Sequence, residues 1–513
     1  MDMAEVVRMM TPITPVMDNA NLDLYFFFVP YRLIWEHLQQ FFGENDTAPW
    51  TQQIEYEIPQ IVAPENGWTK GSLADHFGFP TKVGGYKASA LGFRAYAKCV
   101  NDWFRDENLK NPLYIHMGDA DITGVDILDA NLDPVTDIEK GACCFKVAKT
   151  HDYFTSCLPG AQKGPAVPLP LGDKAPLIAT DKVPTGQTAA ANMVGKELTW
   201  YARSTAGEMV DLNNPSNYPA ANTFMGLAVD LSSAVGATVS ALRQAFSIQR
   251  FYEKQALFGT RYIEFIKGHF MVQNPDFRLQ RSEYLGGSRI PININQVVAT
   301  NQTQQQLGGE YENGVWTWEM TDLAPQGNTA AYSLTSSRDK GIFTHSFTEH
   351  GIVLGLACVR LASHTYQQGL NRQWIRKKML DFYMPEFANL SNDIVYNKEI
   401  MLQGPSVVDT DGEVVDDQVF GYQEKWADYR YSPDIVTGEM RSNYDQSLDI
   451  WHWADYYETL PSLGSDWIDE DKANFERTLA VQNHDQFFGD FYFKCIYTRP
   501  MPLYSVPGLI DHH

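Results

Sequence analysis

The segment from Leu22 to Pro30, LDLYFFFVP, is the feature that most restricts how this chain folds. If it is a strand, its side chains alternate between two faces. One face carries Leu22, Leu24, Phe26 and Phe28, and the other carries Tyr25, Phe27 and Val29. After Asp23 both faces are apolar, and such a strand is stable only when it is covered on both sides. The segment therefore predicts a buried strand inside a layered β protein.

Other strand-like runs lie at 142–148, 342–347, 352–361, 419–426 and 487–498. Long loops separate them, which argues against alternating strands and helices and favours an antiparallel sandwich or barrel with insertions. A hairpin is expected within the turn-rich stretch 293–332, around 312–318. In the last run, we expect Phe491 and Phe493 to share one core with Leu24, Phe26 and Phe28.

Helical spacing is clearest near the middle of the chain. Leu242, Ala245, Phe246, Gln249, Tyr252 and Ala256 recur every three or four residues, and Gly259 follows as a C-cap candidate. This pattern predicts a helix of about five turns. Shorter helices are expected at 33–42 and 91–103. After the long helix, the polar run from Arg278 to Tyr284 either clamps loops of the same chain or reaches another chain.

Composition narrows the class of protein. Aromatic residues make up 13% of the 513 residues and charged residues only 20%, which favours a globular β protein over a disordered or coiled-coil one. The net charge of −23 opposes broad attraction to nucleic-acid phosphates, so any such contact must be local. Six cysteines without C-x-x-C spacing and no signal-like N-terminus indicate folding in a reducing cytosol. No apolar run is long enough to span a membrane.

Motifs for catalysis, cofactors or metals are weak. Phosphate-loop and nucleophile-elbow patterns are missing from the sequence. The segment 119–124 begins like a calcium loop, but its twelfth position is Ala130 rather than a glutamate. His345, Glu349 and His350 lack the spacing of a zinc helix, and the carboxylates Asp449 and Asp455 beside Trp451 and Trp453 only loosely suggest a sugar-cleaving cleft. We expect no catalytic, cofactor or metal site.

One basic cluster stands out in this acidic chain. It contains Arg372, Arg376, Lys377 and Lys378, with Trp374 between them. Positive charge beside an aromatic ring is the combination that holds single-stranded nucleic acid by phosphate contacts and stacking. The alternative is that these side chains pair with carboxylates of this chain or a neighbouring subunit.

Several ordered blocks resemble the major capsid proteins of the Microviridae, small single-stranded DNA phages, in their gokushovirus-like branch. They include TPITPVMDNANLDLYFFFVPYRLIW, HDYFTSCLPGAQKGPAVPLPLG, GTRYIEFIKGHF, RLQRSEYLGGS, FTEHGIVLGLACVR, FGYQEKWADYRYSP and RPMPLYSVPGLIDHH. Together these blocks span nearly the whole chain. Related chains carry more residues before the segment around Val6, so an inner N-terminal arm is expected to be incomplete here.

The resemblance implies a mostly β fold: an eight-stranded antiparallel jelly roll with large loop insertions and a few short helices. Residues 1–172 would form its first part, 173–239 a variable surface insertion at the three-fold axes, and 240–513 the remainder. Turn-rich composition and lost periodicity between 172 and 236 agree with an insertion. About sixty copies would form a T=1 icosahedral shell around circular single-stranded DNA.

The resemblance also implies partners and a location. Expected partners are further copies of the chain, the DNA genome, a small basic DNA-binding protein and a host receptor contacted by the insertion. The protein would reside in the virion after assembly in the bacterial cytoplasm.

The tail 499–513 reads as an extended arm because it contains three prolines. Its apolar anchors for a neighbouring subunit would be Leu503, Tyr504, Val506, Leu509 and Ile510. Alternatively, the tail completes the core of its own protomer. The competing function is a carbohydrate-active or carbohydrate-binding β-sandwich protein, which would also explain the abundance of aromatic residues.

Overall fold

The computed structural model describes most of the chain and divides it into two compact units. The described residues are 1–42, 44, 56–125, 138–141, 143–164, 177–179, 188–194, 197–203, 209–211, 227–229, 239–258, 267–271, 280–298, 306–312, 315–321, 329–388, 392–481 and 484–499. The first unit comprises Met1–Ala161 and Gly259–His513, and the second comprises Gln162–Phe258. No helix among the described residues is both long and apolar enough to cross a membrane.

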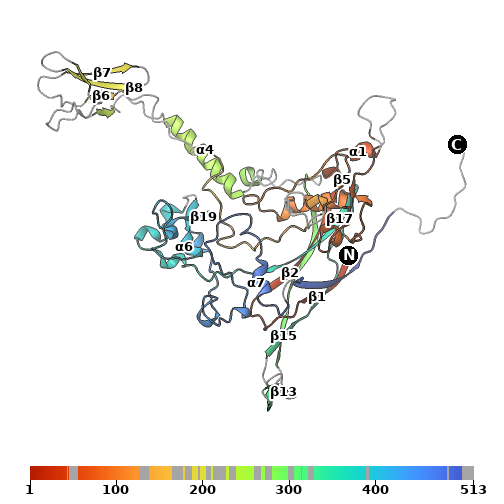
Figure 1. Ribbon diagram of the computed structural model, residues 1–513. Coiled ribbons are helices and arrows are strands. Elements are labelled where there is room, and N and C mark those ends of the chain that lie inside the picture. Colours follow the sequence, from red (N-terminus) through yellow and green to blue (C-terminus); the bar gives the residue numbers. More distant parts are fainter. Residues whose placement is uncertain are drawn as a thin grey trace, which may run out of the picture. The chain divides into compact units, whose positions relative to one another are not determined.

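The predicted buried strand is β2 (Ala20–Pro30), and it lies at the centre of a three-stranded antiparallel sheet (Figure 1). Its neighbours are β11 (Glu283–Pro291) and β17 (Gly351–Leu361). The charged residue within β2, Asp23, is 1% exposed. One arginine from each neighbouring strand pairs with it: Arg289 at 2.6 Å and Arg360 at 2.7 Å. Burial alone would raise the pKa of Asp23, but these two guanidinium groups hold it below its usual value.

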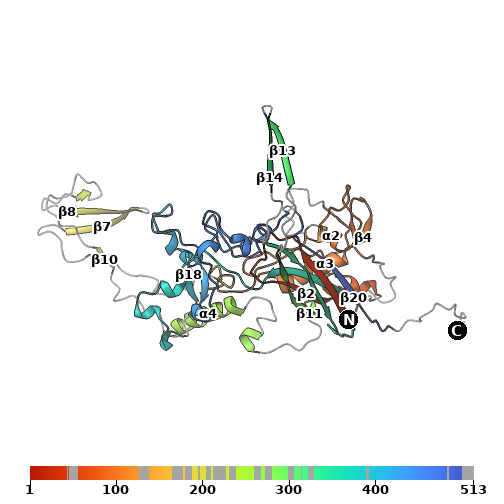
Figure 2. The same cartoon turned by 90° about the horizontal axis from the view of Figure 1, so that it is seen from below.

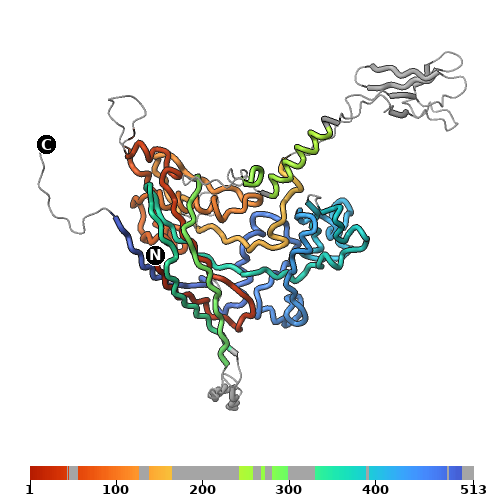
Figure 3. The backbone as a smooth tube through the Cα atoms, turned by 180° about the vertical axis from the view of Figure 1, so that it is seen from behind, coloured from red at the N-terminus to blue at the C-terminus, as the bar shows by residue number. Residues whose placement is uncertain are grey.

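A second sheet faces the first. It has the order β16-β1-β20, with β1 (Asp2–Met9) between β16 (Thr335–Asp339) and β20 (Phe487–Lys494), and both pairings are antiparallel. Figure 3 shows the red N-terminal strand lying along the blue C-terminal strand. The two ends of the described chain are therefore joined directly by backbone hydrogen bonds.

The two faces of β2 contribute to two different cores. Leu22, Leu24 and Phe26 pack between the sheets, against inward residues of β1 and β20 such as Val7 and Phe491. Phe27 and Val29 pack on the opposite side, against α3 (Leu91–Cys99) and the buried rings of Trp35 and Trp68. In Figure 2, α3 lies beside the sheet that contains β2. The apolar character of both strand faces is thus explained by cores on both sides.

A ribbon connects the two sheets at one edge. In it β12 (Ile294–Val298) pairs with β15 (Thr329–Ser333), continuing β11 and β16 respectively. Beyond it, β13 (Gln306–Glu312) and β14 (Val315–Thr321) form the hairpin that the sequence predicted.

The close approach of β11 to β2 requires glycine, because a Cβ on Gly287 would lie 2.2 Å from the Leu24 carbonyl oxygen.

Smaller elements cover the sheets. The remaining strands of the first unit are β3 (Gln60–Val62), β4 (Lys87–Ser89), β5 (Ile122–Thr123), β18 (Asn392–Tyr396) and β19 (Val419–Glu424). Its short helices are α1 (Leu38–Phe41), α2 (Leu73–His76), α6 (Asn397–Ile400) and α7 (Lys472–Glu476). The π-turn η2 (Val100–Phe104) extends α3 and completes the helix predicted at 91–103. Of the helix predicted at 33–42, only its second half, α1, is α-helical.

The second unit contains the predicted long helix, α4 (Val239–Phe258), of 20 residues. Ala245 and Ala256 on the expected apolar face are buried, whereas Phe246 on the same face is 62% exposed. The strands of this unit are β6 (Leu177–Ala179), β7 (Thr188–Val194), β8 (Glu197–Arg203), β9 (Met209–Asp211) and β10 (Leu227–Val229). Most of the predicted insertion, 173–239, lies outside the described residues.

The mostly β prediction is confirmed, with several small antiparallel sheets and few helices. Two predicted strands are wrong. The described part of 142–148 forms only isolated bridges, from Cys143 to Ser72 and from Ala148 to Asp469, and 342–347 is irregular. Phe493 also differs from expectation, because it is 47% exposed although its ring lies 6.1 Å from that of Phe26.

Candidate nucleic-acid interface

The predicted basic cluster lies on a chain segment held by short turns. These turns are η5 (Arg372–Trp374) and η6 (Met379–Asp381). The Asp381 carboxylate accepts hydrogen bonds from the backbone N–H groups of Lys377 and Lys378, each at 2.7 Å, and these bonds lower the pKa of Asp381. The backbone of both lysines is therefore fixed while their side chains are exposed.

All four predicted basic residues line one cavity of about 560 Å³, together with two lysines that the sequence analysis missed. The added residues are Lys398, on α6, and Lys425, just after β19. Four aspartates also line the cavity: Asp381, Asp393, Asp417 and Asp428. No local spacing connects Lys398 or Lys425 to the cluster, because only the tertiary fold brings these segments together.

Most of these cations pair within the chain. Arg372 contacts Asp393 at 2.9 Å and Glu399 at 3.0 Å. Arg376 pairs with Asp428, Lys398 with Asp417, and Lys425 with Asp393. Among the described residues, the side chains of Lys377 and Lys378 form no ion pair. Arg372 and Arg376 thus pair with carboxylates of this chain, which was the alternative to binding nucleic acid. Lys377 and Lys378 remain available to an external anion.

Trp374 is 72% exposed and lines an aromatic cavity next to the basic one. A second cavity, of about 240 Å³, is lined by Trp374 and by Tyr153, Phe154, Tyr366 and Tyr431. Arg372 and Asp428 line both cavities. Arg376 also lies over an aromatic ring, that of Tyr429, at 4.2 Å. Cations and exposed rings are therefore adjacent, as stacking and phosphate binding require.

The other candidate motifs have structural partners. In the calcium-like segment, Asp119 accepts a hydrogen bond from Trp35 Nε1 at 2.7 Å, and Asp121 pairs with Lys87 at 2.7 Å. Within the described residues no group of side chains could hold a metal ion. His345 contacts Glu283, whereas Glu349 pairs with Arg32, so these two side chains have separate partners.

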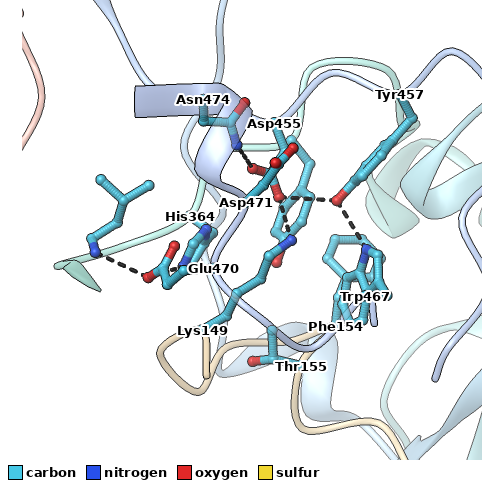
Figure 4. Close-up of polar contacts among 12 residues, drawn as sticks. Lys149, Phe154, Thr155, His364, Asp455, Tyr457, Trp467, Glu470, Asp471 and Asn474 are labelled. Atoms are coloured by element: carbon cyan, nitrogen blue, oxygen red, sulfur yellow. Dashed lines mark hydrogen bonds and ion pairs between the residues drawn. The ribbon is translucent and has the colours of Figure 1, made fainter. Parts of the chain in front are cut away.

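Of the four residues that loosely suggested a sugar-cleaving cleft, Asp449 and Trp451 are half-buried and the other two are buried. Trp453 is fully buried and Asp455 is 2% exposed, so a sugar ring does not reach either side chain. Instead, Asp455 pairs with Lys149 at 2.7 Å and accepts hydrogen bonds from Tyr457 and Asn474 (Figure 4). Burial would raise the pKa of Asp455, but Lys149 and His364 keep it below its usual value. Sequence reasoning missed this network because its members are far apart in the chain.

The predicted arm residues from Leu503 to Ile510 lie outside the described residues. Their prediction therefore stays untested, as does the role of the basic cluster.

Comparison with known proteins provides the strongest functional information. A family described as capsid protein (F protein) matches residues 1–509. The chain is 40% identical to capsid protein VP1 of Spiroplasma virus 4, with 99% of this chain and 89% of the relative covered. It is 37% identical to capsid protein VP1 of Chlamydia phage 1 (98% and 89% covered) and 39% identical to that of Bdellovibrio phage phiMH2K (98% and 88%).

Proposed function

Because this chain belongs to the capsid protein (F protein) family and is a major capsid protein, we propose that about sixty copies assemble into a T=1 icosahedral shell around circular single-stranded DNA. The observation that carries the proposal is the family match over nearly the entire chain. The protein is structural rather than enzymatic and is a component of the virion. We place assembly in the cytoplasm of the bacterial host.

Electron microscopy of the purified protein tests the assembly proposal. The expected result is closed, uniform spherical particles, with or without added circular single-stranded DNA. A protein that stays monomeric over a range of salt and DNA concentrations would contradict the shell and favour the carbohydrate-binding alternative.

The finer fold that we propose is the eight-stranded jelly roll. The two facing sheets contribute six strands, and the β12–β15 ribbon extends two of them, β11 and β16. Support comes from the shared core between the sheets and from the antiparallel pairing of all these strands. An experimental structure with a different strand count or order would reject it.

For DNA contact, we propose that Lys377 and Lys378 bind phosphate and that Trp374 stacks on a base, while Arg372 and Arg376 shape the cavity through their ion pairs. The charge of −23 leaves the remaining DNA neutralisation to a separate small basic protein.

Salt-dependent binding to a single-stranded oligonucleotide tests the two lysines. Replacing both Lys377 and Lys378 with Gln should reduce the slope of log K against log salt by about 1.4, or about 0.7 for each lost phosphate contact. The matched control replaces the exposed Arg338 and Lys340 with Gln, which changes the net charge equally. A double variant with the slope of the control would contradict the assignment.

A further inference from the structure

β20 is an edge strand with an unpaired side. Met10 N–H donates to the Gln486 carbonyl at 2.8 Å, in the same register that pairs Arg8 with Phe488. Even-numbered residues of β20 therefore direct their backbone groups toward β1, and odd-numbered residues from Phe487 to Phe493 direct theirs away. Within the described part of the chain, no strand pairs with that outer side.

The exposed edge is rich in aromatic side chains, and its charged residues are Asp490 and Lys494. Phe488 is 54% exposed and Tyr492 is 64% exposed on the outer face of the sheet. Phe493 points toward the core but is still 47% exposed, so the core is open at this edge. A long edge strand without covering residues is a template for another strand.

The described residues after β20 do not turn back onto it. Residues 495–499 continue past the strand without regular structure, and Ile496 and Tyr497 are 86% and 71% exposed. A tight hairpin after β20 would need Gly or Asn at the turn, but Cys495–Pro500 contains neither. The covering strand is therefore not the residues that immediately follow.

Two copies of β20 that run antiparallel to each other have complementary charges. Asp490 and Lys494 lie on the outer face, and neither takes part in an ion pair among the described residues. Two antiparallel copies of β20 centred on Tyr492 place each Asp490 opposite Lys494 of the other copy, and each Phe491 opposite Phe493. In this register, odd-numbered residues form the hydrogen-bonded pairs, as the outward backbone groups require.

We propose that β20 pairs with β20 of a second copy across a two-fold axis at Tyr492, which joins two three-stranded sheets into one. Such a contact is isologous: each surface meets its own equivalent, and icosahedral shells contain two-fold axes. The inference rests on the capsid function and specifies one of the contacts between its copies.

A disulfide trap tests the register directly. Tyr492→Cys, with the exposed Cys495 replaced by Ser, puts the new cysteine opposite its own equivalent at about 4.5 Å between Cα atoms, within disulfide range. Assembled particles of this variant should give a covalent dimer on a non-reducing gel after mild oxidation. The matched control, Phe488→Cys with Cys495→Ser, faces Ile496 of the second copy and should give none.

The outcomes separate this inference from the capsid function. Particles that form but contain no dimer linked through residue 492 would overturn the two-fold pairing and leave β20 covered by a tail or another partner. A wild-type protein that forms no particles would contradict the capsid assembly itself.

Charge reversal provides a second, independent measurement. Asp490→Lys or Lys494→Asp alone places like charges opposite each other twice, and should weaken self-association in sedimentation velocity by about tenfold. The double variant Asp490→Lys/Lys494→Asp restores opposite charges and should recover most of the loss. Equal association of all four proteins would overturn the proposed register.

Discussion

Asp455 holds three separate chain segments together through one buried carboxylate. Its ion pair with Lys149 has both side chains about 2% exposed, and Tyr457 and Asn474 complete its hydrogen bonds. Removing one partner of such a pair leaves an uncompensated charge in the interior. We expect Lys149→Met to lower the unfolding free energy of the protomer by about 3–5 kcal/mol in urea titrations.

The control for this prediction is a pair at the surface. Arg430 and Glu424 are 58% and 45% exposed, so Arg430→Met should cost less than about 1 kcal/mol. If the two variants lost similar stability, the Lys149–Asp455 pair would not have the structural role that its burial indicates.

His364 should make stability depend on pH. Burial alone would lower its pKa, but Glu470, 3.2 Å from Nε2, and Asp455 raise it above its ordinary value, against the opposing charge of Lys149. Because the folded-state pKa is raised, protonated His364 contributes to the unfolding free energy. This contribution is complete below about pH 6.5, and it is lost as pH rises through the folded-state pKa. Glu470 also accepts the Leu361 N–H at the end of β17, so His364 helps to fix that strand.

The measurement is the unfolding free energy from about pH 6 to pH 9, in the wild type and in His364→Gln. The wild type should lose stability over this range, and the variant should show a smaller slope. Identical slopes would show that His364 has the same pKa in the folded and unfolded states.

Among the elements, β2 is the most sensitive to truncation. Phe26 is 5% exposed between the sheets, and its ring lies 5.7 Å from that of Phe343. Phe26→Ala should lower the unfolding free energy by about 3–5 kcal/mol because it leaves a cavity in the core. Phe488→Ala, at an exposed position of β20, should change it by less than about 0.5 kcal/mol and serves as the control. Similar losses in both variants would contradict the assigned core.

Strands with strong apolar patterns were predictable, because the residues that look apolar in the sequence are also the ones that the fold places in sheets. β2, β17, β19 and β20 belong to this group. β1 and β11 were not predicted, because DMAEVVRM carries charge and EYLGGSRIP begins within the polar run from Arg278 to Tyr284. In β11, Gly287 is required by the close packing against β2 and Gly286 by that against Ile342, which a single sequence does not distinguish from a turn signal.

The candidate site was predictable only in part, for the same physical reason. Arg372 to Lys378 are neighbours in sequence, so their basic character was visible. Their acidic partners Asp393, Glu399 and Asp428 come from later segments, and the fold alone decides that the arginines are neutralised while the two lysines are not. The strands falsely expected at 142–148 and 342–347 are rich in apolar residues, but in the described structure these residues are only half-buried or exposed, as is Phe347 at 45%.

At the scale of the whole molecule, we propose that the insertion 173–239 is dispensable for folding and used in host attachment. Support comes from the separate compact unit Gln162–Phe258, which encloses this range, and from the cores of the other unit. Replacing 173–239 with a short Gly-Ser linker should leave soluble protomers with nearly unchanged melting temperature, while particles lose adsorption to host cells. Insoluble protein would place the insertion in the folding core.

For the tail, we propose that 499–513 is an arm that docks on a neighbouring subunit. Deleting Tyr504–His513 should leave the melting temperature of the protomer nearly unchanged and sharply reduce particle yield, since prolines limit the entropy lost on docking. Light scattering and thermal unfolding of the same preparation measure both effects. A protomer that unfolds after the deletion would show that the tail completes its own core.

The pairing of β1 with β20 cannot form until the end of translation. Met3 lies opposite Phe493, so the first strand to leave the ribosome waits for a partner translated about 490 residues later. At about 5–20 residues per second, that wait is roughly 25–100 s, and until then β1 has only β16 as a partner in its sheet. If β20 forms the two-fold contact proposed above, unfinished chains lack that edge and do not enter growing shells.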